Sequence, residues 1–537
     1  MTIMEILTTI AYWLMLCIAA FCTAAELKRD LMMMQQNSYR IDRYMRWLKA
    51  SGDTTSLPRL VGMIAFLGSM VTFSRPALGM ILIAVFSLGE LLWLSTRRYK
   101  KPLVWTRRCR RIYVVAALIC VAVALAALLS VSGEGELMRF FAPTVALCGL
   151  FCASHIVTVA AVWLLQPVEK HINKGFYDDA ARILRSMPDL KVIGITGSYG
   201  KTSTKHYLYR ILSESFEVLM TPGSYNTTMG VIRTVRELMK PYTQIFICEM
   251  GAKQPGDIKE ICDLVHPEAG IITAVGPQHL ESFKTVDTVC RTKFELVDAL
   301  PADGFAVVND DFEKSAQRVV DNVECIRYAV NNTGAASYTA ADIHYSAAGT
   351  TFTVVGPGGR KLALRTRLVG ECNISNLLAA VIVALKLGVP EDKIRYAVER
   401  IEQVEHRLNV RRTPGGVTII DDAFNSNPTG SAMALDVLAA MSTGKRIIVT
   451  PGMIELGDRQ DELNREFGQK IAQCADVAIV VGLYNRAAIT AGINDGGCEP
   501  PQTYTVDSLG DAQQVLSRIA AAGDTILYEN DLPDTFK

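Results

Sequence analysis

The stretch 191–205, KVIGITGSYGKTSTK, combines the residue types that bind nucleotide phosphates. Its apolar run 192–196 predicts a short buried strand, and Gly197 and Gly200 predict a loop directly after it. A helical pattern then continues to Leu212. In such an arrangement the backbone N–H groups of the loop and the N-terminus of the helix face an anion. We therefore expect a phosphate-binding loop, with a plain glycine turn as the alternative.

Three side chains at the start of the expected helix supply the chemistry. Lys201 can neutralise phosphate charge, the Thr202 hydroxyl can bind Mg²⁺, and Ser203 follows them. The spacing departs from the general pattern G-x-x-x-x-G-K-[ST], because Ile195 stands where that pattern has its first glycine. What remains is a shorter form, T-G-x-x-G-K-T.

Two further expected strands end in polar residues. Residues 244–250 (QIFICEM) include Glu249 at their end, and residues 269–275 (AGIITAV) lead to His279. Strands and helices alternate from Asn173 to about Leu300, which favours an α/β fold with a parallel, doubly wound sheet whose strand ends meet beside the phosphate loop. A carboxylate and a histidine there suit metal coordination beside a nucleotide, although Mg²⁺ prefers oxygen ligands. The alternative is that each is an ordinary strand-end residue.

From about Ile193 to about Gly457 the chain resembles the Mur ligases, and among them the members that add D-alanyl-D-alanine. The resemblance rests on several motifs that follow one another in the order and with the spacing of that family. They are TGSYGKT at 196–202, GSYNTTMGV at 223–231, EMGA at 249–252, HLE at 279–281 with Lys293 and Glu295, NDD at 309–311, GECNISNL at 370–377, HR at 406–407, DDAFNSNP at 421–428 and PGMIELG at 451–457.

The resemblance implies ATP-dependent amide formation with two Mg²⁺ ions in the site. In that family the glutamate of E-M-G-A and the histidine of H-L-E bind metal, which corresponds to Glu249 and His279 here, with Thr202 as a further ligand. The lysine that corresponds to Lys293 is carbamylated and holds the second ion. A carbamate suits this role because it replaces a repelled ammonium with an anionic oxygen donor. Lys201, His279 and Lys293 are the residues expected to be catalytic.

The same resemblance assigns other positions to the nucleotide and the substrates. The expected nucleotide contacts are Gly197, Gly200, Lys201, Thr202, Ser203, Asn309, Asn376, Arg407 and Asp421. The expected substrate contacts are Asn226 and Thr227, together with Asn425 and Asn427 at the site of the incoming amine. The chain departs from the family at Cys372 and His406, which stand in place of a histidine and a glycine.

The first third of the chain has the composition of a membrane domain. Half of all residues are hydrophobic, the mean hydropathy is +0.22, and the apolar excess is concentrated before residue 170. We expect five membrane spans, of which the second is short enough to be a re-entrant segment. The expected spans are 4–25, 60–73, 77–95, 112–131 and 140–165.

The charges between these spans predict an orientation. Six Lys and Arg residues lie between 28 and 49 and eight between 97 and 111, whereas the loops near Arg75 and at 132–139 carry little positive charge. The positive-inside rule then places the N-terminus outside and everything after Leu165 in the cytoplasm, which is the side that holds ATP. Binding to anionic lipid headgroups is the alternative interpretation of the arginine clusters.

Composition excludes two other classes of protein. The formal net charge is +1, so nothing indicates a nucleic-acid partner. The thirteen cysteines include no C-x-x-C pair, so neither a zinc ribbon nor a disulfide framework is indicated, and reduced thiols are expected.

We therefore expect a multi-pass protein of the cytoplasmic membrane with three domains: a membrane domain at 1–172, a central ATP-binding domain at 173–403 and a Rossmann-like α/β domain at 404–537. The expected function is ATP-dependent ligation, through an acyl phosphate, of an amino acid or dipeptide to a lipid-linked or membrane-proximal carboxylate in cell-wall synthesis. The lipid-linked substrate is expected because membrane spans occupy the place of the family's UDP-binding domain. The alternatives are a polyglutamate-type synthetase of an envelope polymer and a membrane ATPase or transporter that forms no amide.

Overall fold

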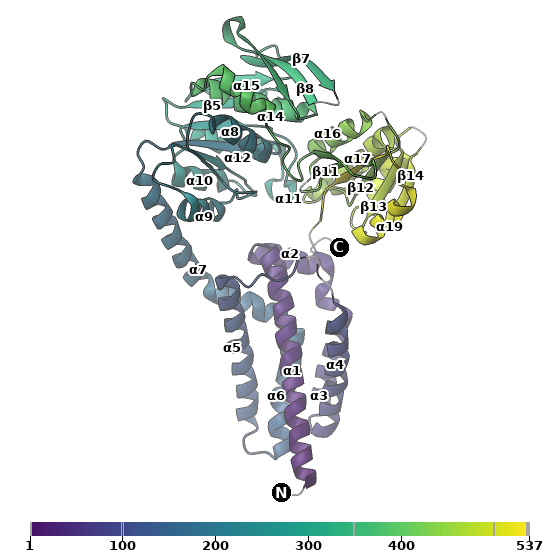
Figure 1. Cartoon of the computed structure of the whole chain (residues 1–537). Helices are drawn as coiled ribbons and strands as arrows, with labels where there is room; N and C mark the ends of the chain where they lie inside the picture. Colours follow the sequence, from purple (N-terminus) through teal and green to yellow (C-terminus); the bar gives the residue numbers. More distant parts are fainter. Residues whose placement is uncertain are drawn as a thin grey trace. The chain divides into compact units, whose positions relative to one another are not determined.

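The computed structural model describes residues 3–97, 99, 101–346, 349–424, 426–441, 443–497 and 500–532. The chain divides into two compact units, residues 1–173 with 532–537 and residues 174–531 (Figure 1). The first unit is built from helices, and the described strands all belong to the second.

The first unit contains helices of membrane-spanning length. Among the described residues, three helices are long and apolar enough to cross a membrane, or four if α6 and α7, which meet at 79°, count as one broken span. Helix α3 is apolar but shorter. The expected number of five spans therefore stays a prediction. The helices are α1 (Ile3–Gln36), α2 (Ile41–Ser51), η1 (Asp53–Thr55), α3 (Leu57–Val71), α4 (Pro76–Thr96), α5 (Arg107–Ser130), α6 (Glu136–Cys152) and α7 (Ser154–Arg185).

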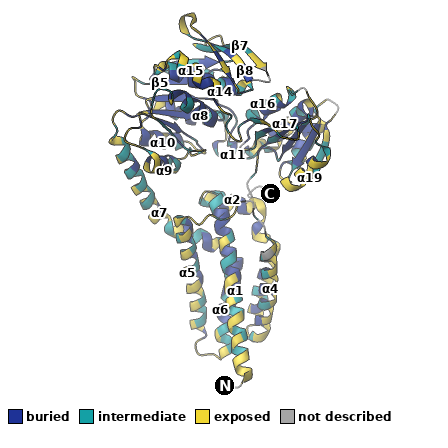
Figure 2. Cartoon of the chain, in the orientation of Figure 1, coloured by how far each residue is buried: buried dark blue, intermediate teal, exposed yellow. Residues whose placement is uncertain are grey.

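The outward faces of these helices are apolar. Val71, Leu92 and Leu129 are each at least 70% exposed, and Figure 2 shows exposed residues along α1, α4 and α5. Exposed aliphatic residues in such numbers are costly in water and favourable in a hydrocarbon layer. This surface is the kind that membrane helices present to lipid.

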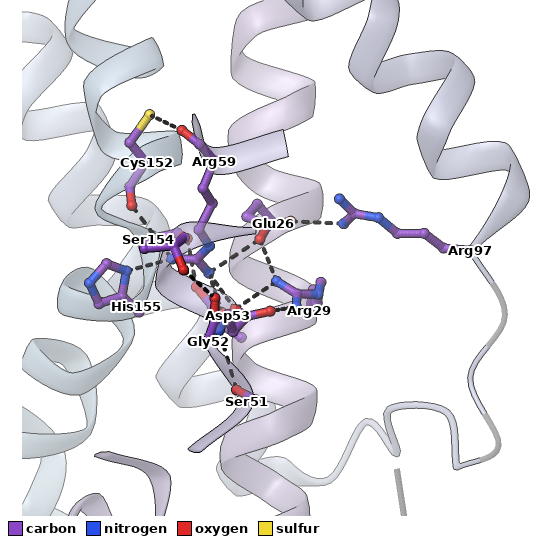
Figure 3. A network of polar contacts seen from close by, with 12 residues as sticks. Glu26, Arg29, Ser51, Gly52, Asp53, Arg59, Arg97, Cys152, Ser154 and His155 are labelled. Atoms are coloured by element: carbon purple, nitrogen blue, oxygen red, sulfur yellow. Dashed lines mark hydrogen bonds and ion pairs between the residues drawn. The ribbon is translucent and has the colours of Figure 1, made fainter. Parts of the chain in front are cut away.

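The interior of the first unit holds a cluster of charged side chains (Figure 3). One guanidinium nitrogen of Arg59 lies 2.7 Å from a carboxylate oxygen of Asp30, 3.2 Å from Glu26 and 3.4 Å from Asp53. The Ser154 hydroxyl donates to Asp30 at 2.6 Å. Because these residues come from α1, η1, α3 and α7, the cluster ties together segments that are far apart in the sequence.

The second unit begins with a sheet in the order β2-β3-β1-β4-β5-β6-β7-β8-β9. Neighbouring strands are parallel from β2 to β7 and antiparallel from β7 to β9. The strands are β1 (Lys191–Thr196), β2 (Val218–Met220), β3 (Ile245–Glu249), β4 (Ala269–Ile272), β5 (Phe305–Asn309), β6 (Glu324–Ala329), β7 (Tyr338–Ser346), β8 (Gly349–Val355) and β9 (Lys361–Thr366).

Helices cover both faces of the parallel part of this sheet. Val192 and Phe246 pack in one core with α9, α10 and α12, whereas Ile193 and Ile245 pack in another with α8, α14 and α15. Burial of both faces explains why the strands are almost continuously apolar. The helices are α8 (Lys201–Leu212), α9 (Thr228–Leu238), α10 (Asp257–Val265), α11 (Leu280–Phe283), α12 (Val286–Asp298), α13 (Glu313–Ala316), α14 (Glu371–Lys386) and α15 (Glu391–Glu399).

A second sheet follows in the order β10-β11-β15-β12-β13-β14. Only β10 runs antiparallel to its neighbour among the described strands of this sheet. The elements are β10 (Asn409–Arg412), β11 (Thr418–Asp422), α16 (Pro428–Ala439), β12 (Arg446–Thr450), α17 (Gln460–Cys474), β13 (Val477–Val481), α18 (Arg486–Asn494), β14 (Gln502–Val506), α19 (Leu509–Ile519) and β15 (Thr525–Glu529).

The predicted parallel α/β sheet is confirmed. The strand expected at 192–196 is β1, the one expected at 244–250 is β3, and the expected helix α8 ends at Leu212. As expected for parallel strands, the carboxyl ends of β1, β3 and β4 lie at one edge, where the phosphate loop also lies.

Candidate active site

The loop between β1 and α8 fits tightly against its neighbours. A Cβ atom at Gly197 would lie 2.1 Å from the Thr273 hydroxyl, and one at Gly200 would lie 2.3 Å from the Asn376 side-chain oxygen. Gly200 also has a φ of +81°, a conformation that favours glycine. The structure therefore brings together the predicted nucleotide contacts Gly197, Gly200 and Asn376.

Lys201 is the first residue of α8 and folds back over this loop. Its ammonium group donates to the Gly197 carbonyl at 2.5 Å and to the Ser198 carbonyl at 3.3 Å. Burial lowers its pKa to about 8, and Glu249 opposes that shift. In the described part of the chain no carboxylate lies within ion-pair distance of this ammonium, so its charge is available to an anion.

Glu249, at the end of β3, accepts hydrogen bonds on both carboxylate oxygens. Lys205 Nζ lies 2.9 Å from Oε2, while Thr202 Oγ1 at 3.2 Å and Asn226 Nδ2 at 3.1 Å donate to Oε1. Burial alone would raise the pKa of Glu249, but Lys205 and Lys201 hold it below its ordinary value. The carboxylate is thus ionised, and it contacts Thr202, the other oxygen donor predicted to bind metal.

His279 contacts a carboxylate from the second sheet's domain instead of Glu249. Its Nδ1 atom lies against Glu455 of the loop that follows β12. Burial lowers the pKa of His279, and the hydrogen bond to Glu455 opposes this shift. Among the described contacts none joins His279 to Thr202 or Glu249. Thr202 and Glu249 therefore contact each other, whereas His279 contacts neither of them.

Lys293 lies inside α12 and is 1% exposed. The described residues offer its ammonium no hydrogen bond. Burial, followed by the charge of Lys201, lowers its pKa far below the ordinary value. A neutral, nucleophilic amine is the form that such an environment favours.

Asn309, at the end of β5, is bound to its surroundings by its own amide. Its Nδ2 group donates to the Thr273 carbonyl at 2.9 Å and to the Ser375 hydroxyl at 3.0 Å, and its Oδ1 accepts from the Asp311 N–H at 3.0 Å. The side chain thus joins the end of β5 to the neighbouring strand and to α14. This contact shapes the predicted nucleotide side of the site.

Arg407 and Asp421 lie in the domain of the second sheet. The Arg407 guanidinium lies 4.2 Å from the centre of the Phe424 ring, and its burial lowers its pKa. Asp421 accepts from His406 Nδ1 at 2.9 Å. His406, which departs from the family at this position, thus contacts Asp421, one of the residues predicted to bind the nucleotide.

The other predicted positions divide between helix ends and the interior. Thr227 accepts from the Gly230 N–H at 3.3 Å at the start of α9, and Asn427 accepts from the Gly430 N–H at 3.0 Å at the start of α16. Both are helix N-caps, which is a structural use of these side chains. Ser203 is buried in α8. Asn425 lies outside the described residues.

Two contributors were missed by the sequence analysis. Lys205 follows Lys201 by one helical turn, and residues four apart lie on the same face of a helix. The spacing therefore could have indicated a second lysine near the phosphate loop. Glu455 belongs to the motif PGMIELG, but its partner His279 is 176 positions away. No local pattern indicates a contact over that separation.

Comparison with known proteins places this geometry in a family. Residues 195–384 match the Mur ligase middle domain, and residues 406–528 match the Mur ligase, glutamate ligase domain. The UDP-N-acetylmuramoyl-tripeptide--D-alanyl-D-alanine ligase of Escherichia coli (strain K12) is 30% identical over 364 residues, which cover 67% of this chain and 79% of the relative. The enzyme of the same name from Bacillus subtilis is 27% identical over 344 residues, which cover 63% of this chain and 72% of the relative.

Solved structures agree with this assignment. MurF from Acinetobacter baumannii superposes with a TM-score of 0.60 at 26% identity, over 66% of this chain and 77% of that one. The MurF ligase of Thermotoga maritima in complex with ADP shares the fold, with a TM-score of 0.60 at 24% identity over 67% of this chain and 80% of that one. The chain therefore belongs to the Mur ligase family of ATP-dependent amide-bond ligases.

Proposed function

We propose that this protein is a membrane-anchored ligase that uses ATP to join an amino acid or dipeptide to a lipid-linked or membrane-proximal carboxylate of a cell-wall precursor. The observation that carries the proposal is the presence, in one chain, of a Mur ligase site and of helices long and apolar enough to cross a membrane. Residues 1–194 precede the matched middle domain, and they include those helices.

The side chains of the site fit a triphosphate. Three cations, the buried Lys205 and the half-buried Lys201 and Arg407, lie in the middle and C-terminal parts, and Glu249 is the carboxylate whose charge acts on all three. Such an excess of positive charge in a poorly solvated site favours a polyanionic ligand. We assign the loop from Gly197 to Ser203 to the phosphates, with Asn309, Asn376, Arg407 and Asp421 on the nucleotide side.

The donor set also fits Mg²⁺. The hydroxyl of Thr202 and the carboxylate of Glu249 are hard oxygen donors in mutual contact, and we assign them to the metal with His279 as a third ligand. A neutral Lys293 amine can add to carbon dioxide, so we assign a carbamate and a second ion to that position. When bound, Mg²⁺ would neutralise charge on the reacting phosphates.

In the proposed reaction a substrate carboxylate attacks the γ-phosphate of ATP, and ADP leaves. An amine then attacks the resulting acyl phosphate, an amide bond forms and inorganic phosphate leaves. Lys201 would hold the γ-phosphate and neutralise the developing charge, which is what phosphoryl transfer chiefly requires. Asn226 and Thr227 would face the carboxylate substrate, and Asn425 and Asn427 the amine.

The relatives support the direction of this proposal. Their printed names give a UDP-linked tripeptide and D-alanyl-D-alanine as the two substrates of those proteins. We propose a dipeptide or amino acid as the amine here, and we replace the UDP-linked substrate with a membrane-bound one. We also propose the three-domain division at 1–172, 173–403 and 404–537, with a Rossmann-like third domain and an external N-terminus.

The test is a ligation assay on the purified full-length protein in detergent or nanodiscs. Lipid-linked and UDP-linked muropeptides are each offered with ATP, Mg²⁺ and a panel of amino acids and dipeptides, and products are identified by mass spectrometry. Amide formation on the lipid-linked substrate, with phosphate release that depends on the added amine, is the expected result. Ligation of UDP-linked substrates alone would overturn the lipid-linked part. Amine-independent ATP hydrolysis without product would favour the membrane ATPase.

A further inference from the structure

Lys205 is a buried cation whose place in the proposed reaction is not yet explained. It lies one helical turn after Lys201 on α8, and none of its surface is exposed. Its ammonium is 2.9 Å from Glu249 Oε2 and also donates to the Gly223 carbonyl. Burial of an ammonium costs free energy unless hydrogen-bond acceptors replace the lost water, and Lys205 has two such acceptors.

The bonds to Glu249 are unequal on its two oxygens. Oε2 receives a charged donor at 2.9 Å, whereas Oε1 receives neutral donors at 3.1 and 3.2 Å, from Asn226 and Thr202. Charge-assisted hydrogen bonds are stronger than neutral ones. Lys205 therefore fixes the carboxylate through one oxygen, and the more weakly held oxygen points to Thr202, the other proposed metal ligand.

Lys205 also holds the segment that precedes α9. Its bond to the Gly223 carbonyl attaches residues 221–227 to α8, and the 2.7 Å bond from the Gly251 N–H to the Asn226 carbonyl attaches them to the end of β3. A Cβ atom at Gly251 would lie 2.7 Å from the Asn226 side chain, so the two segments are in close contact. Asn226 and Thr227 of this segment are the residues that we assign to the carboxylate substrate.

We infer that Lys205 is a positioning residue that presents Oε1 of Glu249 to the metal and sets the register of segment 221–227 against it. The inference rests on the proposed function, because it gives Lys205 a role in that same site. Glu249, the proposed metal ligand, and segment 221–227 then share Lys205 as a common partner. Partners that orient a metal-binding carboxylate typically change metal affinity by about 10–100-fold when they are removed.

The sign of the effect on metal binding distinguishes this role from two simpler ones. If Lys205 acted only as a nearby positive charge, its removal would strengthen cation binding, because like charges repel. If it only stabilised the fold, thermal stability would fall and metal affinity would not change. A positioning role predicts weaker metal binding in spite of the removal of a positive charge.

The experiment compares Lys205→Met and Lys205→Gln with the wild-type full-length protein, using Mn²⁺ as the probe and electron paramagnetic resonance to count free ions in the presence of ADP. The expected result is about 10–100-fold weaker Mn²⁺ binding for Lys205→Met. Lys205→Gln retains a shorter donor and should give an intermediate loss. Lys259→Met, which removes an exposed ion pair with Asp263, serves as the matched control.

A second readout is the KM of the carboxylate substrate, measured together with the affinity for ADP. We expect the KM of the carboxylate substrate to rise in Lys205→Met while ADP binding in the presence of a chelator is unchanged. Stronger or unchanged Mn²⁺ binding in a folded variant would overturn the inference, and Lys205→Gln decides the matter if Lys205→Met does not fold. Should the wild-type protein ligate no substrate, the proposed function fails, whereas the Mn²⁺ titration still judges Lys205.

Discussion

Each unit of the molecule buries a network of charged side chains, and the two networks balance their charges differently. In the first unit, Arg59 lies among three carboxylates (Figure 3). Arg97 contacts both Glu26 and Glu90 at 2.9 Å. In the second unit, two lysines, the buried Lys205 and the half-buried Lys201, outnumber Glu249, the carboxylate that lies near both. A network whose charges are met internally holds helices together, whereas one with unmet positive charge is suited to a polyanionic ligand.

The carboxylates of the first unit show this difference most clearly. Oxygens of Glu26, Asp30 and Asp53 lie close enough together to hold a metal ion. One nitrogen of Arg59 lies within 3.4 Å of all three, so a guanidinium already supplies the positive charge that an ion would bring. The network around Arg59 therefore holds the helices together, and we call it the joint of the first unit. We expect metal in the catalytic unit instead.

The largest expected effect comes from removing the unmet cation of the catalytic unit. Lys201→Ala should leave the fold intact, because the ammonium donates only to loop carbonyls, but it should reduce ATP-dependent ligation by about 10²–10³-fold or more. Initial rates of amine-dependent phosphate release measure the effect.

Lys191→Ala is the matched control, since Lys191 is an exposed lysine at the start of β1, the strand that precedes the phosphate loop. Its rate should equal that of the wild type. Full ligase activity in Lys201→Ala would show that the charge of this lysine is dispensable, and the assignment of the phosphate site would be wrong.

The next effect tests the joint in the first unit. Arg59→Met keeps an unbranched apolar side chain but leaves three buried carboxylates without their shared partner, which should lower the free energy of unfolding by about 3–5 kcal/mol. Thermal unfolding in detergent measures this loss, and ADP binding by the surviving folded protein should be unchanged.

Arg139→Met is a suitable comparison, because Arg139 is exposed and its side chain donates to the Ser132 carbonyl. We expect no measurable change in its unfolding. If Arg59→Met were as stable as this control, the network would not be a joint, and the contrast between the two units would disappear.

How much of each network the sequence could reveal depends on separation along the chain. The loop between β1 and α8 was predicted because strand, glycines, Lys201 and Thr202 are contiguous, and the strands beside it, β1, β3 and β4, were visible as apolar runs. The contact of Lys205 with Glu249 spans 44 positions and that of His279 with Glu455 spans 176. Tertiary packing alone creates such pairs. The sequence therefore shows that these residues can carry charge, but it does not show which residues they contact.

The family resemblance extended the prediction where local pattern ended. It singled out Lys293, which no hydrogen bond in the described structure would have suggested. The structure shows that Lys293 is buried and that the charge of Lys201 contributes to lowering its pKa. It could not reveal the joint around Arg59, because that part of the chain lies outside the matched domains. Helix packing, which brings Asp30 and Ser154 together over 124 positions, decides that network.

The smallest effect concerns a buried pair in the second unit, in which two carboxyl groups face each other. Asp422 and Glu529 are neighbours on β11 and β15, and Glu529 Oε1 accepts from the Ser426 and Ser431 hydroxyls at 2.7 and 2.8 Å. Burial raises the pKa of Asp422 to about 6 and raises that of Glu529 well above its ordinary value. A proton shared with Asp422 would satisfy Glu529 Oε2, which has no hydrogen-bond partner among the described residues.

This pair predicts how stability depends on pH. The folded protein retains protons that the unfolded chain releases above about pH 4, so the stabilisation is complete at low pH and is lost as pH rises through 6. In Glu529→Gln the amide donates to Asp422 permanently and its oxygen still accepts from both serines. We expect the variant to match the wild type at pH 5 and to exceed it by about 1–3 kcal/mol at pH 8. Urea unfolding at the two pH values measures the difference, with Glu324→Gln at an exposed ion pair as the control. A variant less stable than the wild type at pH 8 would mean that Glu529 is ionised in the fold, and that this domain balances its buried charges without a shared proton.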